Sequence, residues 1–226
     1  MDTLTELSLF TGYGGLSLGL RLAGVHSKVV CYVENEPYCQ EIIKARAAEG
    51  HLDDAPIWDD VRTFHGRPWR GAVDIITAGF PCQPHSTAGK CLGSHDSRNL
   101  WPDTLRVIGE VGPRWALLEN VAGISYGGRP YAATVAGELA EIGYDTTWHF
   151  VSAASVGAPH LRWRWWCLAY PQCESSEIRG DDRPDADISR TRKGDHRGSR
   201  GDDRRELNAS PHEPVVPYPT GGGHAE

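Results

Sequence analysis

The sequence places a cysteine, a potentially reactive side chain, on a rigid bend. Cys82 stands in "GFPCQPHS" (79–86), between Pro81 and Gln83, with Pro84 directly beyond. The two prolines exclude a helix or a strand interior and hold the chain in one bend. Three roles fit a thiol held in this way: a buried structural cysteine, a metal ligand, or a nucleophile kept at a fixed angle.

The metal and nucleophile interpretations use the neighbouring residues differently. Cys82, His85, Cys91 and His95 form the pattern C-x2-H-x5-C-x3-H, and these side chains suit zinc. The spacing between the two pairs is short for a zinc site, and Pro84 stiffens the first pair. Cys82 also follows an expected strand in a proline-rich loop, where functional residues concentrate. A fixed bend would hold a nucleophile in one attack geometry.

Three charged side chains further along could act on a substrate. "WALLEN" (115–120) places Glu119 at the end of an apolar run, where loss of hydration would raise the pKa of its carboxyl and let it donate a proton. A carboxylate that caps the next loop is the alternative. "HLRWRWW" (160–166) adds Arg162 and Arg164, which share one face if the segment is extended. They would bind a phosphate or a polarised carbonyl, or simply lie on a solvated face.

A glycine-rich turn, "FTGYGG" (10–15), follows an expected strand and opens a helix. It allows close approach of a ligand to the backbone, but it lacks the G-x-G-x-x-G pattern of pyrophosphate binding, so it favours a small nucleoside ligand or a plain tight turn. Glu34 follows the next strand, about 20 residues on, where an acid reaches ribose hydroxyls. On spacing alone, Glu36 could take the same role. Asp59 and Asp60 could accept a bond from an adenine amino group or form a surface turn.

The elements that must position these groups alternate between strands and helices. This pattern predicts an α/β fold with a mostly parallel sheet, whose ligands bind beyond the carboxyl ends of the strands. The expected strands are 5–10, 28–33, 72–79, 115–120, 144–151 and 163–170, with a weaker one around Ile57; the expected helices are 16–24, 36–50 and 130–143.

The composition sets broad limits on the class of protein. The chain has 226 residues and a net charge of −7, so it is not a basic nucleic-acid coat, although a local basic stripe would suffice for binding. No secretory signal or apolar run of membrane-spanning length stands out. Six cysteines at uneven spacings fit a reduced, cytoplasmic setting.

The chain changes character near Tyr170. Residues 171–226 carry charged runs such as "RGDDRPDAD" and too little apolar surface to offset chain entropy, so we expect a polar, disordered tail after a catalytic domain at 1–170. The large apolar residues of this tail are Ile178, Ile188, Leu207, Val215 and Val216.

Several motifs occur in an order that is specific as a set. "FTGYGGLSLGL", "VENEPYCQ", "DDV", "GFPCQPHS", "ENV" and "PHLRWRWW" together resemble the cytosine-5 DNA methyltransferases of phage and bacterial type, over about residues 5–169. The resemblance implies a Rossmann-like class I S-adenosylmethionine-dependent methyltransferase, with helices on both faces of the sheet and an antiparallel last strand.

The resemblance also assigns a cofactor site for S-adenosyl-L-methionine. Phe10 would stack on the adenine, the acid Glu34 would bind the ribose, and Asp60 with Val61 would contact the adenine. "PYCQ" as the anchor favours Glu34 over Glu36. The remaining implied cofactor positions are Gly12, Gly14, Gly15, Leu16, Asn35, Gly79, Pro81 and Leu100.

The same resemblance implies a covalent mechanism on cytosine in double-stranded DNA, without a metal. Cys82 would attack C6 of the base, and neutral Glu119 would hold N3 and donate a proton as charge develops there. Arg164 would hold the cytosine carbonyl and the glutamate, and Arg162 would support the catalytic loop. The implied substrate contacts are Gln83, Ser86, Asn120 and Val121.

The sequence departs from the family pattern in two places. His160 stands where a glutamine usually precedes the Arg-x-Arg pair. No target-recognition region or Gly-Asn motif is found after residue 170, so we expect either a second polypeptide that carries them or a truncated product. A tRNA cytosine-5 methyltransferase and an inactive cofactor-binding or DNA-binding remnant are the alternative functions.

Overall fold

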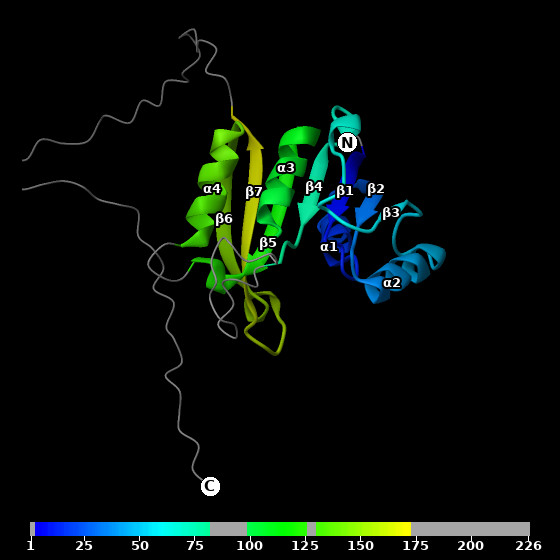
Figure 1. Cartoon of the computed structure of the whole chain (residues 1–226). Helices are drawn as coiled ribbons and strands as arrows, with labels where there is room; N and C mark the ends of the chain where they lie inside the picture. The colour runs from blue at the N-terminus through cyan, green and yellow to red at the C-terminus, as the bar shows by residue number, and fades with distance from the viewer. Residues whose placement is uncertain (1–2, 82–98, 126–129, 173–226) are drawn as a thin grey trace, which may run out of the picture. The chain divides into compact units, whose positions relative to one another are not determined.

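The computed structural model of the protein describes residues 3–81, 99–125 and 130–172 (Figure 1). The chain divides into two units, Met1–Glu177 and Ile178–Glu226, and all of the described residues belong to the first.

A seven-stranded sheet forms the centre of this unit, in the order β3-β2-β1-β4-β5-β7-β6. The pairs from β3 across to β5 are parallel, whereas β7 runs antiparallel to both β5 and β6. The predicted mostly parallel sheet with an antiparallel last strand is therefore confirmed. The strands span Leu4–Leu9 (β1), Ser27–Val33 (β2), Ile57–Trp58 (β3), Ile75–Ala78 (β4), Trp115–Val121 (β5), Tyr144–Ser152 (β6) and Trp163–Pro171 (β7).

The strand order reverses direction between β1 and β4. From β1 the chain moves outward to β2 and β3, and then returns to the other side of β1 as β4. Ligands of open α/β sheets bind at such a point, beyond the carboxyl ends of the strands. The glycine turn follows β1, Glu34 follows β2 and residues 79–81 follow β4, so the topology gathers all three at one edge.

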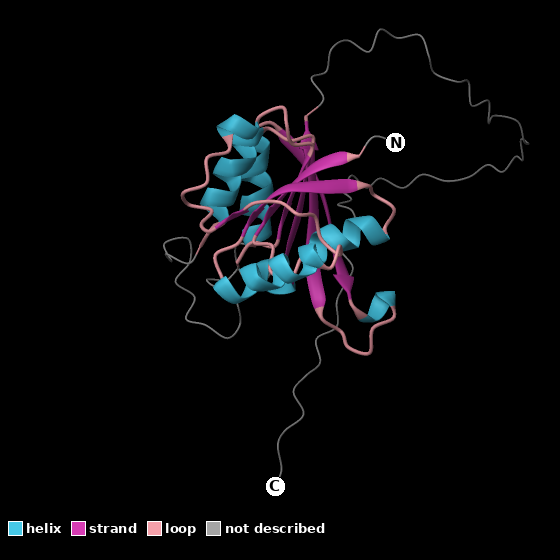
Figure 2. Cartoon of the chain, turned by 90° about the vertical axis from the view of Figure 1, so that its right-hand side faces the viewer, coloured by secondary structure: helices cyan, strands magenta, loops and turns pink. Residues whose placement is uncertain are grey.

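Helices cover both faces of the sheet, as predicted (Figures 1 and 2). Helices α1 (Gly15–Leu22) and α2 (Pro37–Ala48) lie on one face, and α3 (Trp101–Val111) and α4 (Tyr131–Glu141) lie on the other. α3 is absent from the expected elements, although Pro102 in its first turn and Gly112 after its end, at φ +62°, are ordinary helix signals. No helix in the described ranges is long and apolar enough to cross a membrane.

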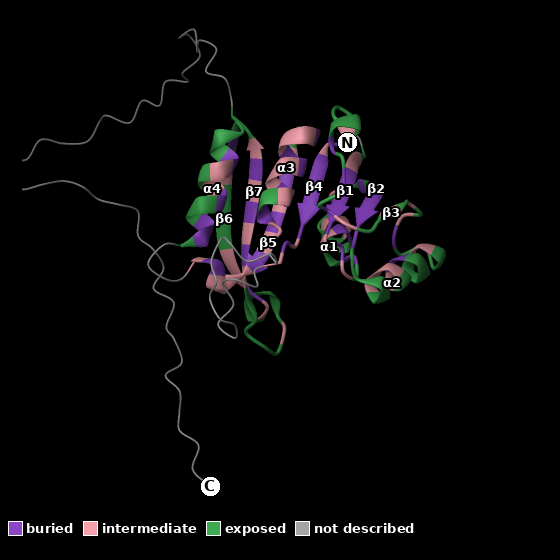
Figure 3. Cartoon of the chain, in the orientation of Figure 1, coloured by how far each residue is buried: buried purple, intermediate pink, exposed green. Residues whose placement is uncertain are grey.

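The main core lies between the sheet and the α3/α4 layer. Leu7, Leu118 and Trp165 are fully buried there, and buried residues run along the central strands (Figure 3). A smaller cluster joins α2 to the opposite face through Val29, Tyr32, Ile43 and Leu52. Apolar packing on both faces of the sheet holds in place the strand ends that carry the motifs.

Candidate active site

A cleft of about 550 Å³ opens at the carboxyl ends of β1, β2 and β4. Its volume is in the range of small-molecule sites. Apolar and acidic groups share its wall, as the binding of a nucleoside would require. The lining residues are Phe10, Val33, Glu34, Asn35, Glu36, Asp60, Val61, Arg62, Pro81 and Leu100.

Glu34 connects the second strand to the glycine turn. Its side chain is buried, its Oε2 accepts a hydrogen bond from the Gly12 amide at 2.6 Å, and its Oε1 accepts one from the Glu36 amide at 2.9 Å. A carboxylate has about four acceptor sites, so acceptor capacity remains for hydroxyls of a ligand. Gly12 adopts φ +56°, a conformation that favours glycine. Glu36 is exposed and lacks a bond to the turn, which sets the two rival glutamates apart.

Phe10 brings an aromatic ring to the cleft from a strained backbone position. It is one of two non-glycine residues in the described ranges with a positive φ, at +52°. Its amide still donates to the Val33 carbonyl at 2.8 Å, which ties the end of β1 to β2. Such strain tends to concentrate at functional sites. The half-buried ring is therefore held where it lines the cleft.

Asp60 enters the cleft already paired with a basic residue. Both of its oxygens accept bonds from the Arg62 guanidinium, at 2.8–3.0 Å, and Oδ1 also accepts from the Arg62 amide. The hydrogen bonds from Arg62 lower the pKa of Asp60, so this carboxyl is an ionised acceptor. Sequence reasoning missed Arg62, although a basic residue two positions after an aspartate was a visible signal.

Glu119 and Arg164 form an ion pair at the ends of neighbouring strands. Arg164 Nε lies 2.7 Å from Glu119 Oε1, and β5 and β7 bring the two residues to the same region of the sheet. Burial raises the pKa of the Glu119 carboxyl, and the charges of Arg164 and Arg162 oppose this shift only in part. A side chain at Gly79 would meet Glu119 Oε2 at 3.5 Å, so this carboxyl lies beside the segment that follows β4.

The segment that leads to Cys82 is anchored from β5. Asn120 is buried and donates from Nδ2 to the Phe80 carbonyl at 3.0 Å. Val121 pairs with Arg164 in the strand ladder. Arg162 is exposed, its φ is +34°, and its charge lowers the pKa of Glu119. Asn120 therefore anchors the chain at Phe80, two residues before Cys82 in the sequence.

The model of one protein family, C-5 cytosine-specific DNA methylase, matches residues 4–201. The chain belongs to that family. The resemblance inferred from the ordered motifs is therefore confirmed.

Relatives in the family are similar over most of this chain. The Type II methyltransferase M.NgoMIV of Neisseria gonorrhoeae is 34% identical over 159 residues, which cover 70% of this chain and 49% of the relative. M.CviJI of Paramecium bursaria Chlorella virus IL3A is 36% identical over 164 residues, covering 72% and 42%. The chain thus spans about half the length of these relatives or less.

The fold agrees with solved structures of methyltransferases. The crystal structure of the S. pombe Dnmt2 methyltransferase matches with a TM-score of 0.60 and 25% identity, covering 77% of this chain and 53% of that protein. The predicted Rossmann-like class I methyltransferase fold is confirmed by this likeness.

More than half of the positions predicted to hold the cofactor line the cleft at the ends of β1, β2 and β4. They are Phe10, Glu34, Asn35, Asp60, Val61, Pro81 and Leu100. Gly12 joins them through its bond to Glu34, and Gly79 lies beside Glu119. Gly15 and Leu16 lie in the first turn of α1.

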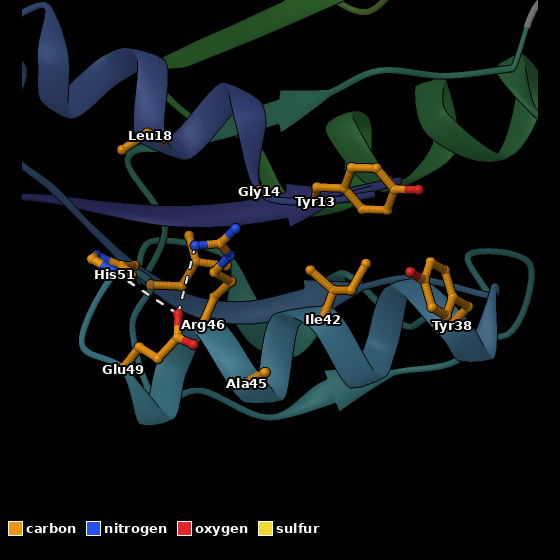
Figure 4. Close-up of a pocket in the computed structure, with 10 residues that line it drawn as sticks. Tyr13, Gly14, Leu18, Tyr38, Ile42, Ala45, Arg46, Glu49 and His51 are labelled. Carbon is orange, nitrogen blue, oxygen red and sulfur yellow. Dashed lines mark ion pairs between the residues drawn. The ribbon is translucent and has the colours of Figure 1, made fainter.

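Gly14 does not line this cleft; it lines a groove between α1 and α2 (Figure 4). The groove has a volume of about 780 Å³, and the exposed Tyr13 and Tyr38 line it. A Cβ at Gly14 would lie 2.8 Å from the Leu52 methyl groups, and its φ is +78°. Gly14 therefore serves close packing beneath the turn.

Gly14→Ala should lower the free energy of unfolding by about 1–3 kcal/mol, because it combines a positive φ with a steric contact. Gly19→Ala is the matched control, since Gly19 lies inside α1 with open space around its Cβ position. The control should leave stability unchanged or raise it by up to about 1 kcal/mol. Urea unfolding curves measure both, and equal effects would contradict this account of Gly14.

The thiols that the structure describes are poor candidates for a nucleophile. Burial raises the pKa of Cys31 to about 11 and that of Cys167 to about 12. The pKa of Cys39 is raised too, mainly by burial and to a smaller extent by the charges of Glu34 and Glu36. Reactive cysteines need a lowered pKa. None of these three is therefore activated in the described structure.

The predicted positions Cys82, Gln83 and Ser86 lie outside the described residues, as do the other members of the zinc pattern, His85, Cys91 and His95. Within the described ranges no group of three or more His, Cys, Asp or Glu side chains is placed to hold a metal ion.

Proposed function

We propose that this protein transfers a methyl group from S-adenosyl-L-methionine to C5 of cytosine in DNA. The observation that carries the proposal is the meeting of two sets of groups at one edge of the sheet. The Gly12–Glu34 bond lies at the ends of β1 and β2, and the Glu119–Arg164 pair lies beside Gly79 at the end of β4. Cys82, the proposed nucleophile, follows directly in the sequence after Pro81, which lines the cleft.

The cleft residues fit the proposed cofactor. Phe10 would stack on the adenine, buried Glu34 would accept bonds from the ribose hydroxyls, and ionised Asp60 would accept from the adenine amino group. S-adenosyl-L-methionine supplies a methyl group on a positively charged sulfur. This charge is compatible with a cleft that carries Glu34, Glu36 and Asp60.

The residues of this chain would activate a carbon that is itself a poor nucleophile. The Cys82 thiolate forms a bond to C6 of cytosine, and the electron pair of the ring moves so that C5 becomes an enamine carbon. Glu119 donates its proton to N3 as charge develops there, and Arg164 stabilises the resulting carboxylate. After C5 has gained the methyl group, water takes the remaining C5 proton, the C5–H electron pair forms the C5=C6 bond, and the Cys82 thiolate leaves C6. N3 then returns its proton to the Glu119 carboxylate.

The target base has to leave the DNA stack to reach these groups. Few clustered basic residues are available to bind phosphates, and the chain carries a net charge of −7. DNA affinity of this chain by itself should therefore be weak.

The α1 side of the sheet supports the proposal that further polypeptide, on this chain or a second one, completes the protein. On β5 and β7 the side chains of Leu117, Trp166, Leu168 and Tyr170 point to this side and are only half-buried. The described helices of this side, α1 and α2, lie towards β1, β2 and β3 (Figure 1). Added polypeptide that carries a target-recognition region would cover apolar surface here.

Glu34→Gln should weaken binding of S-adenosylhomocysteine about 10- to 100-fold, because it replaces a charged acceptor of the ribose and loosens the bond to Gly12. Glu36→Gln, the same change two residues away on the exposed rim, should alter affinity by less than about threefold. Isothermal titration calorimetry measures both dissociation constants. If Glu36→Gln has the larger effect, the assignment of the ribose acid is wrong.

Transfer of a labelled methyl group to DNA and to tRNA tests the substrate class. We expect label in DNA, when the chain is assayed with a polypeptide that carries a target-recognition region, and none in tRNA. Label in tRNA alone would establish the tRNA alternative. Cofactor binding without label in either substrate would establish the binding remnant.

A further inference from the structure

A glutamate of the central strand β1 lies entirely inside the protein. Glu6 has an exposed fraction of 0%, and none of the ion pairs among the described residues includes it. Buried carboxyl groups are costly unless hydrogen bonds satisfy them. Neither the cofactor cleft nor the proposed chemistry uses this side chain.

Three hydroxyl groups supply the hydrogen bonds that Glu6 needs. Its Oε1 accepts from Ser17 Oγ at 2.6 Å and from Thr77 Oγ1 at 2.8 Å, and its Oε2 accepts from Ser27 Oγ at 2.7 Å. All three donors are buried. They belong to α1, β4 and β2, so one carboxyl joins three elements to β1.

Two of these connections lead to the cleft and one leads away from it. Ser17 lies in the first turn of α1, directly after the glycine turn. Thr77 lies on β4, two residues before Gly79. Ser27 is the first residue of β2, at the end of that strand opposite Glu34. Among the hydrogen bonds of Glu6 to the described residues, those to Ser17 and Thr77 therefore lead to the sheet edge that holds the cleft.

Helix α1 buries little apolar surface, because its leucines are half-buried or exposed. Ser17 is its one buried residue, Leu18 and Leu22 have exposed fractions of 46% and 81%, and Gly14 provides no side-chain cap. At its other end Arg21 pairs with Asp53 and donates to the His51 carbonyl. The start of the helix, which closes the glycine turn, is held by Ser17.

We propose that Glu6 is a positioning residue for the cofactor turn and that it acts through Ser17. A buried network in which both carboxylate oxygens accept hydrogen bonds favours one arrangement of the groups it joins. The Glu6–Ser17 bond thereby fixes the first turn of α1, and with it the glycine turn whose Gly12 amide binds Glu34. The part of this proposal that concerns cofactor affinity rests on the function proposed above.

Two serines of equal chemistry allow a matched test in the full chain. Ser17→Ala and Ser27→Ala each remove one buried hydroxyl from Glu6 and leave two. Both should lower thermal stability to a similar extent. Only Ser17→Ala should increase the hydrogen-exchange rates of amides 12–18, by about tenfold, and weaken S-adenosylhomocysteine binding by about five- to tenfold. Ser27→Ala should change either quantity by less than about twofold.

Equal effects of the two substitutions on the turn, or no effect of Ser17→Ala, would overturn the proposal. If an alanine variant does not fold, Ser17→Cys and Ser27→Cys repeat the comparison, because a thiol leaves no cavity at the site and donates a weaker hydrogen bond. The exchange measurement needs no cofactor. A wild-type chain that fails to bind S-adenosylhomocysteine would therefore contradict the proposed function, while the exchange rates would still decide whether Glu6 positions the turn.

Discussion

Glu119→Gln should slow methyl transfer about 10²–10⁴-fold and leave the affinity for S-adenosylhomocysteine within about twofold, because an amide cannot give a proton to N3 of cytosine. The substitution keeps the size of the side chain and one oxygen for the Arg164 guanidinium, which lies 2.7 Å from Glu119 Oε1. Single-turnover transfer of a labelled methyl group measures the rate. Exposed Glu141 on α4 provides a control, Glu141→Gln, which should retain the wild-type rate.

The pH dependence of the reaction follows from the same carboxyl. Burial raises the pKa of Glu119 above its ordinary value, so the proton-donating form persists to higher pH than in an exposed glutamate. The rate should therefore fall as the pH rises through this raised pKa, and Glu119→Gln should lose that limb of the profile. A wild-type rate in the glutamine variant would show that Glu119 is not the proton donor.

The same carboxyl makes protein stability depend on pH. The folded protein binds the Glu119 proton more tightly than the unfolded chain does, so this carboxyl contributes to the free energy of unfolding, and the contribution is fully present below the unfolded pKa. That contribution is lost as the pH rises through the folded pKa.

Cys82→Ala should reduce methyl transfer by at least about 10³-fold, because without a covalent bond to C6 the C5 carbon cannot take the methyl group. Cofactor binding should be retained. Cys39→Ala is the matched control: burial raises the pKa of this partly exposed thiol, which therefore lacks the lowered pKa of a reactive cysteine. We expect this variant to keep the wild-type rate in the same single-turnover assay.

The outcome that would contradict the nucleophile is equally specific. If Cys82→Ala retained activity, or if the purified protein carried stoichiometric zinc that this substitution removed, Cys82 would belong to the metal pattern with His85, Cys91 and His95. Elemental analysis of the wild-type and variant chains distinguishes the two roles.

The sequence indicated the position of the cleft because the motif residues follow strands. Phe10, Glu34 and Pro81 are far apart in the chain, but parallel strands bring their carboxyl ends to one edge. The choice of Glu34 over Glu36 needed the motif order, since spacing alone did not separate them. The bond from Gly12 to Glu34 gives that choice a structural reason.

Other features depend on neighbours that no local pattern reveals. Glu6 and its donors Ser17, Ser27 and Thr77 are spread over four elements, so their meeting follows only from the packed sheet. The bond of Arg106 to the Val61 carbonyl likewise crosses from α3 to the cleft wall. Helix α3 was not predicted, although Pro102 at its start and Gly112 after its end are ordinary helix signals.

Covalent trapping tests the central claim most directly. The chain is mixed with S-adenosyl-L-methionine and a pool of duplexes that contain 5-fluorocytosine in random sequence, together with a polypeptide that carries a target-recognition region. Fluorine at C5 cannot leave as a proton does, so the adduct should persist on a denaturing gel, and peptide mapping should locate it at Cys82. Cys82→Ala should form none. An adduct at another residue, or no adduct from a chain that binds the cofactor and the DNA, would contradict the proposed mechanism.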